Sequence, residues 1–307
     1  MLLLVSKSLF GQNLVNNWSF EDTVACPMGA TQISKATGWD SYKLTPDYFN
    51  YCNTTQVGVP SNFNGYQYAR TGNAYAGFVS FAYYGTNYRE IFGSKLIQQL
   101  NIGQTYYVSF YVSRAFNQPY QNNMASNKLG LKFSTIPFDF FNFIPINDSA
   151  HVYTNTIISD TVNWVKISGS FTADSAYNYF CVGNFFTDSL TSYIKLDSTA
   201  AIAYYYVDDV CISTDSNYCN SLTGLQIRNF KTPISVFPNP VADHLKIEGV
   251  GFTEVIVFDD VGKIVYSKIF ASTVYETKLD LSALTKGIYL VKIKTLHSYY
   301  AQKIIHI

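Results

Sequence analysis

The segment Pro233-Ile-Ser-Val-Phe-Pro-Asn-Pro-Val-Ala-Asp-His-Leu-Lys-Ile247 decides how the C-terminal part of this 307-residue chain folds. Pro238 and Pro240 each fix φ and lack an amide donor, so an extended segment has to end at this turn. Beyond the turn, Leu245 and Ile247 alternate with polar neighbours, which is the period of two expected of a half-buried strand. The segment therefore predicts two strands separated by a proline turn.

The same alternation continues to the C-terminus. Val255 and Val257 repeat it, and the sequence Asp260-Val261-Gly262 is typical of a turn. Further alternating apolar positions are Leu279 and Leu281, then Tyr289, Val291 and Ile293. Several short strands joined by turns predict a small immunoglobulin-like β-sandwich over residues 233–307.

In order and spacing, these segments resemble the C-terminal sorting domain of bacterial type IX secretion substrates. The matching pieces are Pro238-Asn239-Pro240, Asp260-Val261-Gly262-Lys263, Leu279-Asp280-Leu281, Gly287-Ile288-Tyr289 and the basic strand Lys303-Ile-Ile-His-Ile307. The resemblance implies that the type IX machinery carries the chain across the outer membrane, so that it is secreted or attached to the outer cell surface. The alternative is an immunoglobulin-like spacer without a sorting role.

Composition and charge exclude several other classes. Charged residues make up 14% of the chain and aromatic residues 17%, and 21 basic residues balance 21 acidic ones. Without a basic stripe to displace counterions, nucleic-acid binding is not expected. The sequence has no run of about twenty apolar residues, so no transmembrane span is predicted. Residues 1–11 are similar to the end of a secretory signal peptide without its basic region, which predicts a truncated start and a mature chain from about Gln12.

The five cysteines indicate an oxidising compartment. Their spacing predicts two local disulfides, one between Cys26 and Cys52 and one between Cys211 and Cys219. Cys181 remains and is expected to be a buried thiol. The competing interpretation is a metal site, but neither a Cys-x-x-Cys spacing nor a nearby histidine supports zinc.

Residues 12–214 predict a second, larger all-β domain. Tyr106, Val108, Phe110 and Val112 share one face of a strand that follows a turn, and the segment Asn163–Phe171 alternates in the same way. The number of strands and turns predicts a jelly-roll β-sandwich. The polar residues 215–232 predict a linker in which processing could occur.

This region resembles the galactose-binding-like jelly rolls that include many carbohydrate-binding modules. The resemblance rests on the opening Asn17-Trp18-Ser19-Phe20-Glu21, the strand Gly103–Phe110, Trp164 with Ser168–Phe171, and the closing Val207-Asp208-Asp209-Val210. Such modules have glycine where this chain has Trp18. The segments Thr45–Cys52, Ala69–Gly77 and Tyr88–Ile91 also resemble surface proteins exported by the same route. The motifs mainly specify the fold, so ligand binding carries over weakly.

In such jelly rolls the first and last strands are neighbours, which would bring Glu21 and Asp208 together. Two carboxylates with backbone carbonyl oxygens suit calcium, which takes several oxygen ligands in flexible geometry. The resemblance therefore implies a structural calcium ion. The alternative is that both acids are solvated or bond a loop.

Sugar binding needs aromatic faces and a few fixed polar groups. Candidates in segments expected to be loops are Trp39, Tyr42, Tyr83, Tyr84 and Tyr88 with Arg89, whose other expected role is an ion pair with Glu90.

No catalytic residue is predicted. His151 is the only histidine of the larger domain, no Gly-x-Ser-x-Gly elbow is present, and no spacing singles out a pair of acids. We therefore expect a non-catalytic exported protein that binds carbohydrate or another surface ligand. A structural or adhesion module that recognises protein is the alternative, and a glycan hydrolase, which requires acids clustered in a deep pocket, is a third.

Overall fold

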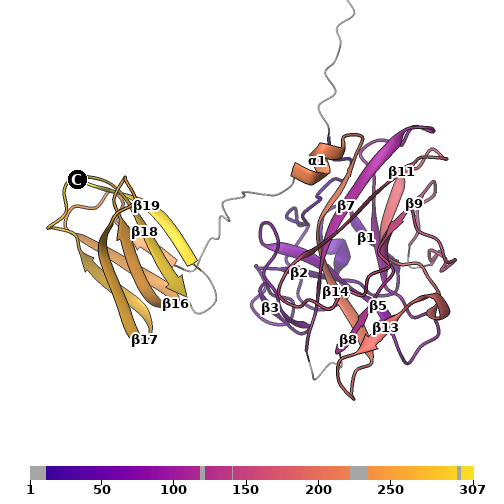
Figure 1. Cartoon of the computed structure of the whole chain (residues 1–307), viewed down its shortest axis with the longest axis horizontal. Coiled ribbons are helices and arrows are strands. Elements are labelled where there is room, and N and C mark those ends of the chain that lie inside the picture. Colours follow the sequence, from indigo (N-terminus) through magenta and orange to yellow (C-terminus); the bar gives the residue numbers. More distant parts are fainter. Residues whose placement is uncertain (1–11, 118–121, 140, 222–233, 296–298) are drawn as a thin grey trace, which may run out of the picture. The chain divides into compact units, whose positions relative to one another are not determined.

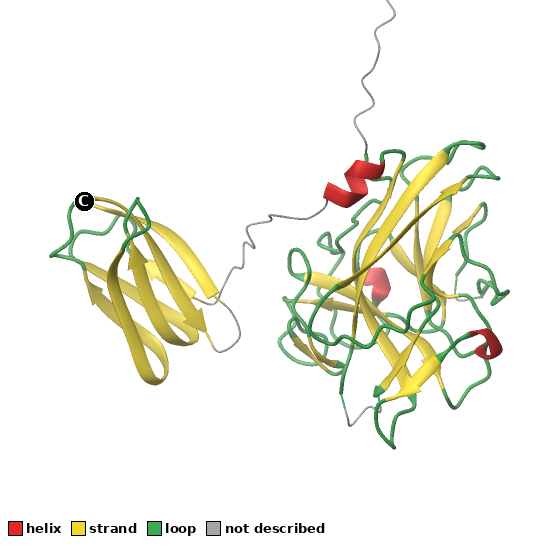
Figure 2. Cartoon of the chain, in the orientation of Figure 1, coloured by secondary structure: helices red, strands yellow, loops and turns green. Residues whose placement is uncertain are grey.

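The computed structural model describes residues 12–117, 122–139, 141–221, 234–295 and 299–307 (Figure 1). It divides the chain into two compact units, Met1–Arg228 and Asn229–Ile307. Strands dominate both units (Figure 2), which confirms the all-β prediction. In the described part of the chain, no helix has the length and hydropathy needed to cross a bilayer. The predicted signal peptide, residues 1–11, lies outside the described residues.

Two antiparallel sheets form the N-terminal unit. The first has the order β1 (Trp39–Lys43), β6 (Ile91–Lys95), β12 (Tyr179–Asn184), β9 (Leu129–Ser134) and β10 (Val152–Tyr153). The second has the order β11 (Val165–Thr172), β7 (Thr105–Arg114), β14 (Ile202–Ser213), β5 (Ala74–Ala82) and β2 (Asp47–Asn50). Shorter elements are β3 (Ser61–Asn62) with β4 (Gly65–Tyr66), β8 (Met124–Ser126) with β13 (Tyr193–Lys195), and the 3-10 helices η1 (Ile33–Lys35) and η3 (Asp188–Leu190).

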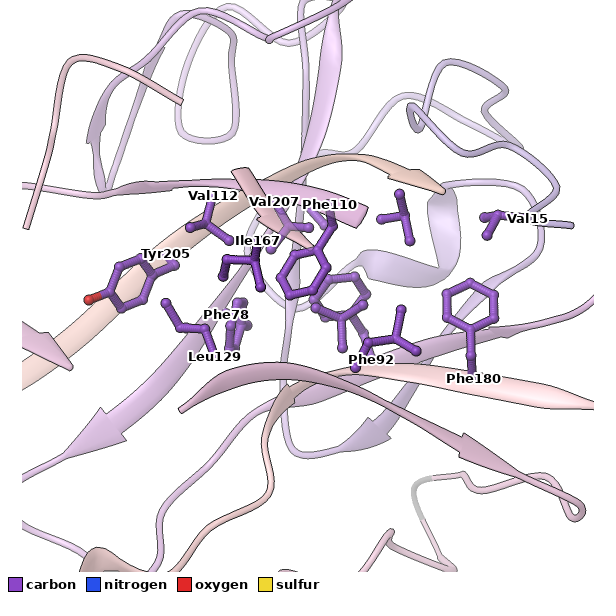
Figure 3. Packing of buried hydrophobic residues seen from close by; sticks show 14 of the residues in the cluster. Val15, Phe78, Phe92, Phe110, Val112, Leu129, Ile167, Phe180, Tyr205 and Val207 are labelled. Carbon is purple, nitrogen blue, oxygen red and sulfur yellow. The ribbon is translucent and has the colours of Figure 1, made fainter. Parts of the chain in front are cut away.

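The main core lies between these two sheets (Figure 3). Phe110, Val112 and Val207 face it from the second sheet, and Phe92 and Phe180 from the first. The predicted alternation along β7 is confirmed, because its apolar face is buried in this core: Tyr106, Val108, Phe110 and Val112. Burial of these apolar faces is the main force that holds the sandwich together.

The outer face of the second sheet is also covered. Tyr75 and Val79 from β5, and Tyr204 and Tyr206 from β14, belong to a separate cluster with residues of the segment 57–69. Strands β5 and β14 are therefore buried on both faces, and their sequences are apolar or aromatic along most of their length rather than alternating. This aromatic layer carries the pocket described below.

The ends of the N-terminal unit are fastened together. The amide of Leu14 donates to the carbonyl of Ile212 over 2.7 Å, so the chain enters beside its last strand, as predicted. Both predicted disulfides are present, Cys26–Cys52 and Cys211–Cys219, and Cys181 is free and buried.

The predicted linker begins too early. Residues Ser216–Ser221 form helix α1, which the Cys211–Cys219 disulfide ties to β14. Polar composition suggested a linker there, but the covalent cross-link and packing against β7 and β14 fix the segment. Residues 222–232 of the predicted linker lie outside the described residues.

The C-terminal unit contains a five-stranded antiparallel sheet with one hydrophobic core. Its two longest strands pair with each other, and register shifts interrupt this pairing. Its strands are β15 (Ile234–Phe237), β16 (His244–Phe258), β17 (Ile264–Asp280), β18 (Gly287–Thr295) and β19 (Tyr299–His306). Leu245, Ile247, Val255 and Val257 are all fully buried, which confirms the alternation predicted for this tail. Gly262 has φ +83° in the predicted turn, a conformation that suits glycine.

Candidate functional site

Two of the predicted ligand-binding aromatics lie in the interior. Trp39 is 2% exposed and Tyr42 4%, so neither ring can stack on a ligand at the surface. The Trp39 ring lies 4.5 Å from that of Phe20, and its indole nitrogen donates to the Asn17 carbonyl over 3.0 Å. The segment expected to be a loop is strand β1, and both residues point inward. Their assignment as surface binding residues was wrong.

Arg89 is also structural. Its side chain is fully buried, and one guanidinium nitrogen donates to Asp188 over 2.9 Å and to the Phe186 carbonyl over 3.0 Å. The predicted pair with Glu90 was wrong, because Arg89 bonds Asp188 instead.

The three remaining tyrosines stay at the surface in two groups. Tyr83 is 59% exposed, with the Lys195 ammonium 3.7 Å from its ring centre. Tyr84 is 63% exposed, and its ring lies 5.9 Å from that of Tyr88. The charge of Glu90 contributes, after burial, to raising the pKa of both Tyr84 and Tyr88, which places these two rings close to that carboxylate.

Near Tyr84 and Tyr88, a pocket of about 210 Å³ with a mainly apolar lining lies on the outer face of the second sheet. Its rim includes the exposed residues Ala30, Thr31 and Thr45. The rest of its lining is buried or half-buried: Asp47, Phe63, Asn64, Val79, Glu90, Asn122, Ile202 and Tyr204. We refer to this cavity as the Asp47–Glu90 pocket.

The two acids of the pocket are held by fixed donors. Asp47 accepts hydrogen bonds from the Thr31 amide over 2.6 Å and from the Tyr204 hydroxyl over 2.5 Å. Glu90 accepts from the Thr45 hydroxyl and from the Val79 amide, each over 2.8 Å. Burial raises the pKa of Asp47 to about 6. Burial, followed by the charge of Asp47, raises that of Glu90 to about 7.

Two amide atoms of the pocket lack partners among the described residues. Asn122 donates to the side-chain oxygen of Asn64 over 2.7 Å, but Nδ2 of Asn64 and Oδ1 of Asn122 make no hydrogen bond. Both residues are at least 97% buried, at 3% and 1% exposure. An unpaired buried polar group is costly, so a polar ligand or water that reaches this donor and this acceptor after a small side-chain movement would offset that cost.

Sequence reasoning assigned none of the residues that line this pocket to a binding site, and it named Glu90 only as an ion-pair partner of Arg89. Asp47 and Glu90 are 43 positions apart, and Asn64 and Asn122 come from two further segments. The antiparallel pairing of β2 with β5 and of β5 with β14 brings Asp47, Val79 and Tyr204 together. The available signal was weak: both acids stand next to apolar and aromatic runs in which a charge is unexpected.

A second buried acidic cluster contains the two predicted calcium ligands. Glu21 accepts from the amides of Asn73 and Ala74 over 2.8 and 3.0 Å. Asp208 accepts from the amides of Arg70 and Thr71 over 2.8 and 3.1 Å. Amides of the segment 70–74 thus bond both acids, and burial, followed by the charges of Asp209 and Glu21, raises the pKa of Asp208.

The bonds from the amides of residues 70–74 to these acids agree with the alternative prediction that the acids bond a loop. Asp209 completes the cluster, paired with the Arg70 guanidinium and bonded by the Thr71 hydroxyl. Burial raises the pKa of Glu21 to about 7 despite its two backbone donors. In the described ranges, no three side chains of His, Cys, Asp and Glu are arranged to hold a metal ion.

Comparison with known proteins identifies the C-terminal unit. Residues 235–307 match the family model described as secretion system C-terminal sorting domain. No curated protein has a matching sequence.

Solved structures resemble the chain only distantly. The enzymatically active domain of bacteriophage CBA120 tailspike protein 4 is 10% identical, with a TM-score of 0.32 over 65% of this chain and 21% of that one. The K1 cleaved adhesin domain of Lys-gingipain from Porphyromonas gingivalis W83 is 14% identical, with a TM-score of 0.32 over 66% of this chain and 96% of that one. The K3 adhesin domain of the same protein is 11% identical, with a TM-score of 0.26 over 56% and 92%. The chain thus spans about a fifth of the tailspike chain.

The residues that match the family model include β16 and β18, whose alternate apolar side chains are buried in the core of the C-terminal unit. Residues 235–307 are a type IX sorting domain, and the protein is secreted or attached to the outer cell surface.

Proposed function

We propose that this protein is an exported, non-catalytic binding protein whose N-terminal unit binds carbohydrate in the Asp47–Glu90 pocket. The observation that carries the proposal is the pair of unpartnered amide atoms, Asn64 Nδ2 and Asn122 Oδ1, in residues of a pocket near the exposed ring of Tyr84 and the half-buried ring of Tyr88. Sugar hydroxyls both donate and accept hydrogen bonds, so one sugar can satisfy an orphaned donor and an orphaned acceptor together.

The apolar parts of the site fit the same ligand. Phe63, Val79 and Ile202 line the pocket and would contact the C–H faces of a sugar ring. Outside the residues that line the pocket, Tyr84 would offer an exposed ring for stacking on a neighbouring sugar. A rigid sheet holds the floor, so the site needs little ordering when the ligand arrives.

The two acids also support a second candidate, a glycan hydrolase, because such enzymes use a pair of carboxyl groups. We favour binding for two reasons. A hydrolase must hold sugars on both sides of the bond that it cleaves, whereas a cavity of about 210 Å³ suits a single sugar ring. Each carboxylate oxygen of Asp47 and Glu90 also accepts a hydrogen bond from a fixed donor.

A protein-binding adhesion role is supported by a different surface. Exposed apolar residues gather on and around β13, each at least 37% exposed: Tyr83, Leu190, Tyr193, Ile194 and Leu196. Clustered exposed apolar residues are a feature of protein interaction sites. This surface does not include the residues that line the Asp47–Glu90 pocket, so mutations can separate the two candidates.

Binding of the full chain to immobilised glycans tests the proposal. Tyr84→Ala is expected to weaken a specific hit about threefold to tenfold, because one aromatic contact is worth about 0.5–1.5 kcal/mol beyond its area. Tyr275→Ala, at a ring of similar exposure (68% against 63%) in the sorting domain, is the matched control and is expected to bind normally.

Silence of a folded sample across the panel would reject carbohydrate binding. Release of shorter sugars from a bound glycan would instead favour the hydrolase. A hit that is lost on Tyr193→Ala and unaffected by Tyr84→Ala would move the site to the β13 surface.

We further propose a structural calcium ion held by Glu21 and Asp208 with backbone oxygens. Without a cation, the pKa of Glu21 is raised to about 7, so the native state binds more protons than the unfolded state between about pH 4.5 and 7. The unfolding free energy should then fall as the pH rises through this range, by about 3 kcal/mol for this one group.

Calcium is expected to restore that loss, so at pH 7.5 a chelator should lower the melting temperature of the wild-type chain. Glu21→Gln should show neither the calcium response nor the corresponding part of the pH dependence. The same melting temperature with calcium and with chelator, together with no metal in native mass spectrometry, would rule out a calcium ion at this site.

A further inference from the structure

The Asp47–Glu90 pocket has an unbalanced charge. Its described lining contains two acids and no lysine, arginine or histidine. Both acids are only 4% exposed. The nearest arginine in the sequence, Arg89, directs its guanidinium to Asp188. Buried carboxylates without a cation are expensive, and a ligand that brings a positive charge would offset that cost.

The hydrogen-bonding groups that remain define the ligand further. A primary ammonium has three donors and no acceptor, and the pocket offers it Asp47, Glu90 and the unpaired Oδ1 of Asn122. The unpaired Nδ2 of Asn64 requires an acceptor, which a hydroxyl oxygen next to the ammonium supplies. Tyr204 and Thr45 donate to the two carboxylates and hold them in place for this contact.

We propose that the pocket selects a sugar residue with a free amino group, bound as its ammonium by Asp47, Glu90 and Asn122. This inference rests on the proposed carbohydrate function and narrows its ligand class. The cavity of about 210 Å³ equals roughly seven water molecules of liquid volume, which suits one sugar ring. Neighbouring sugars of an oligosaccharide would lie over Tyr84 and Tyr88 at the rim.

Two trisaccharides that differ only in acetylation test the charge requirement. Calorimetric titration of the full chain at pH 7.5 would compare β-1,4-linked glucosamine trisaccharide with its fully N-acetylated form. A charge-assisted hydrogen bond to each acid predicts that the amino form binds at least about tenfold more tightly. Equal affinity for the two forms would overturn the inference.

The pH dependence gives a readout that needs no mutation. The acids that face the ligand are Asp47 and Glu90, and the other titratable groups beside them are the hydroxyls of Tyr84, Tyr88, Tyr204 and Tyr206, whose pKa values are raised by burial first. The pKa values of the two acids are about 6 and about 7, whereas the sugar amine takes up protons as the pH falls, so the affinity for the amino form should pass through a maximum and then fall towards pH 5. An affinity that keeps rising down to pH 5 contradicts the proposed contacts.

Variants assign the effect to the pocket. Glu90→Gln and Asp47→Asn should each remove most of the preference for the amino form, whereas Asp40→Asn, at an exposed acid of β1 outside the pocket, should retain it. Specific binding of neutral glycans with no amino preference would refute the inference and leave the proposed function standing. If 1,5-diaminopentane binds as tightly as the amino trisaccharide, the pocket recognises a cation alone, and both proposals fail.

Discussion

Deletion of residues 235–307 is expected to leave the protein in the periplasm, with the signal at the cell surface reduced to background. The sorting domain encloses its own core, separate from those of the N-terminal unit, so its removal should not unfold the rest of the chain. The retained protein should therefore still contain both disulfides, of which neither involves the deleted residues. Fractionation of expressing cells with surface labelling measures the result.

Two point variants test whether export requires that the sorting domain be folded. Val257→Asp places a charge at a fully buried position and should block export, because an unpaired charge in this small core is strongly destabilising. Ile269→Asp introduces the same charge in the same unit at a side chain that is 76% exposed and should be exported. Normal surface display of the deleted form would refute the export role of the domain.

Substitution of Gly72 is expected to give a large loss of stability in the N-terminal unit. Gly72 has φ +63°, and a methyl group added there would overlap the carboxyl group of Glu21. The carboxylate would have to leave the amides of Asn73 and Ala74. The loss of two charge-assisted hydrogen bonds adds to a backbone cost of about 1–2 kcal/mol, for a total of about 3–5 kcal/mol for Gly72→Ala.

Gly103 supplies the matched control. It has φ +82° and no atom within 4 Å of an added methyl group, so Gly103→Ala should cost only the backbone term of about 1–2 kcal/mol. Chemical unfolding of both variants measures the difference. Equal destabilisation would mean that the contact between Gly72 and the Glu21 carboxylate contributes nothing.

The parts of the fold that were predicted from sequence are those with local patterns. Alternation along β7 and β16, the turn at Gly262 and the two short-range disulfides all depend on residues close together in the chain. The prediction failed at Trp39, because Gly38 and the surrounding polar residues suggested a loop where the chain forms a strand of the sandwich. An aromatic residue beside glycine looks the same in sequence whether it faces solvent or the core.

Of the candidate site, only two aromatic residues beside the pocket were predicted as ligand-binding from the sequence. Tyr84 and Tyr88 were named because aromatic residues near a charge suggest sugar binding, and they lie beside the Asp47–Glu90 pocket. The floor depends on strand order and on the layer that covers the second sheet, neither of which is encoded in local spacing. The orphaned atoms of Asn64 and Asn122 become visible only when every hydrogen bond of the folded unit is counted.

The most direct test of the central claim is a crystal structure of the chain with the best ligand from the glycan panel. The account predicts a sugar ring in the Asp47–Glu90 pocket, bonded to Nδ2 of Asn64 and Oδ1 of Asn122, with the next sugar against Tyr84. A bound glycan on the β13 surface, with the pocket filled only by water, would contradict it.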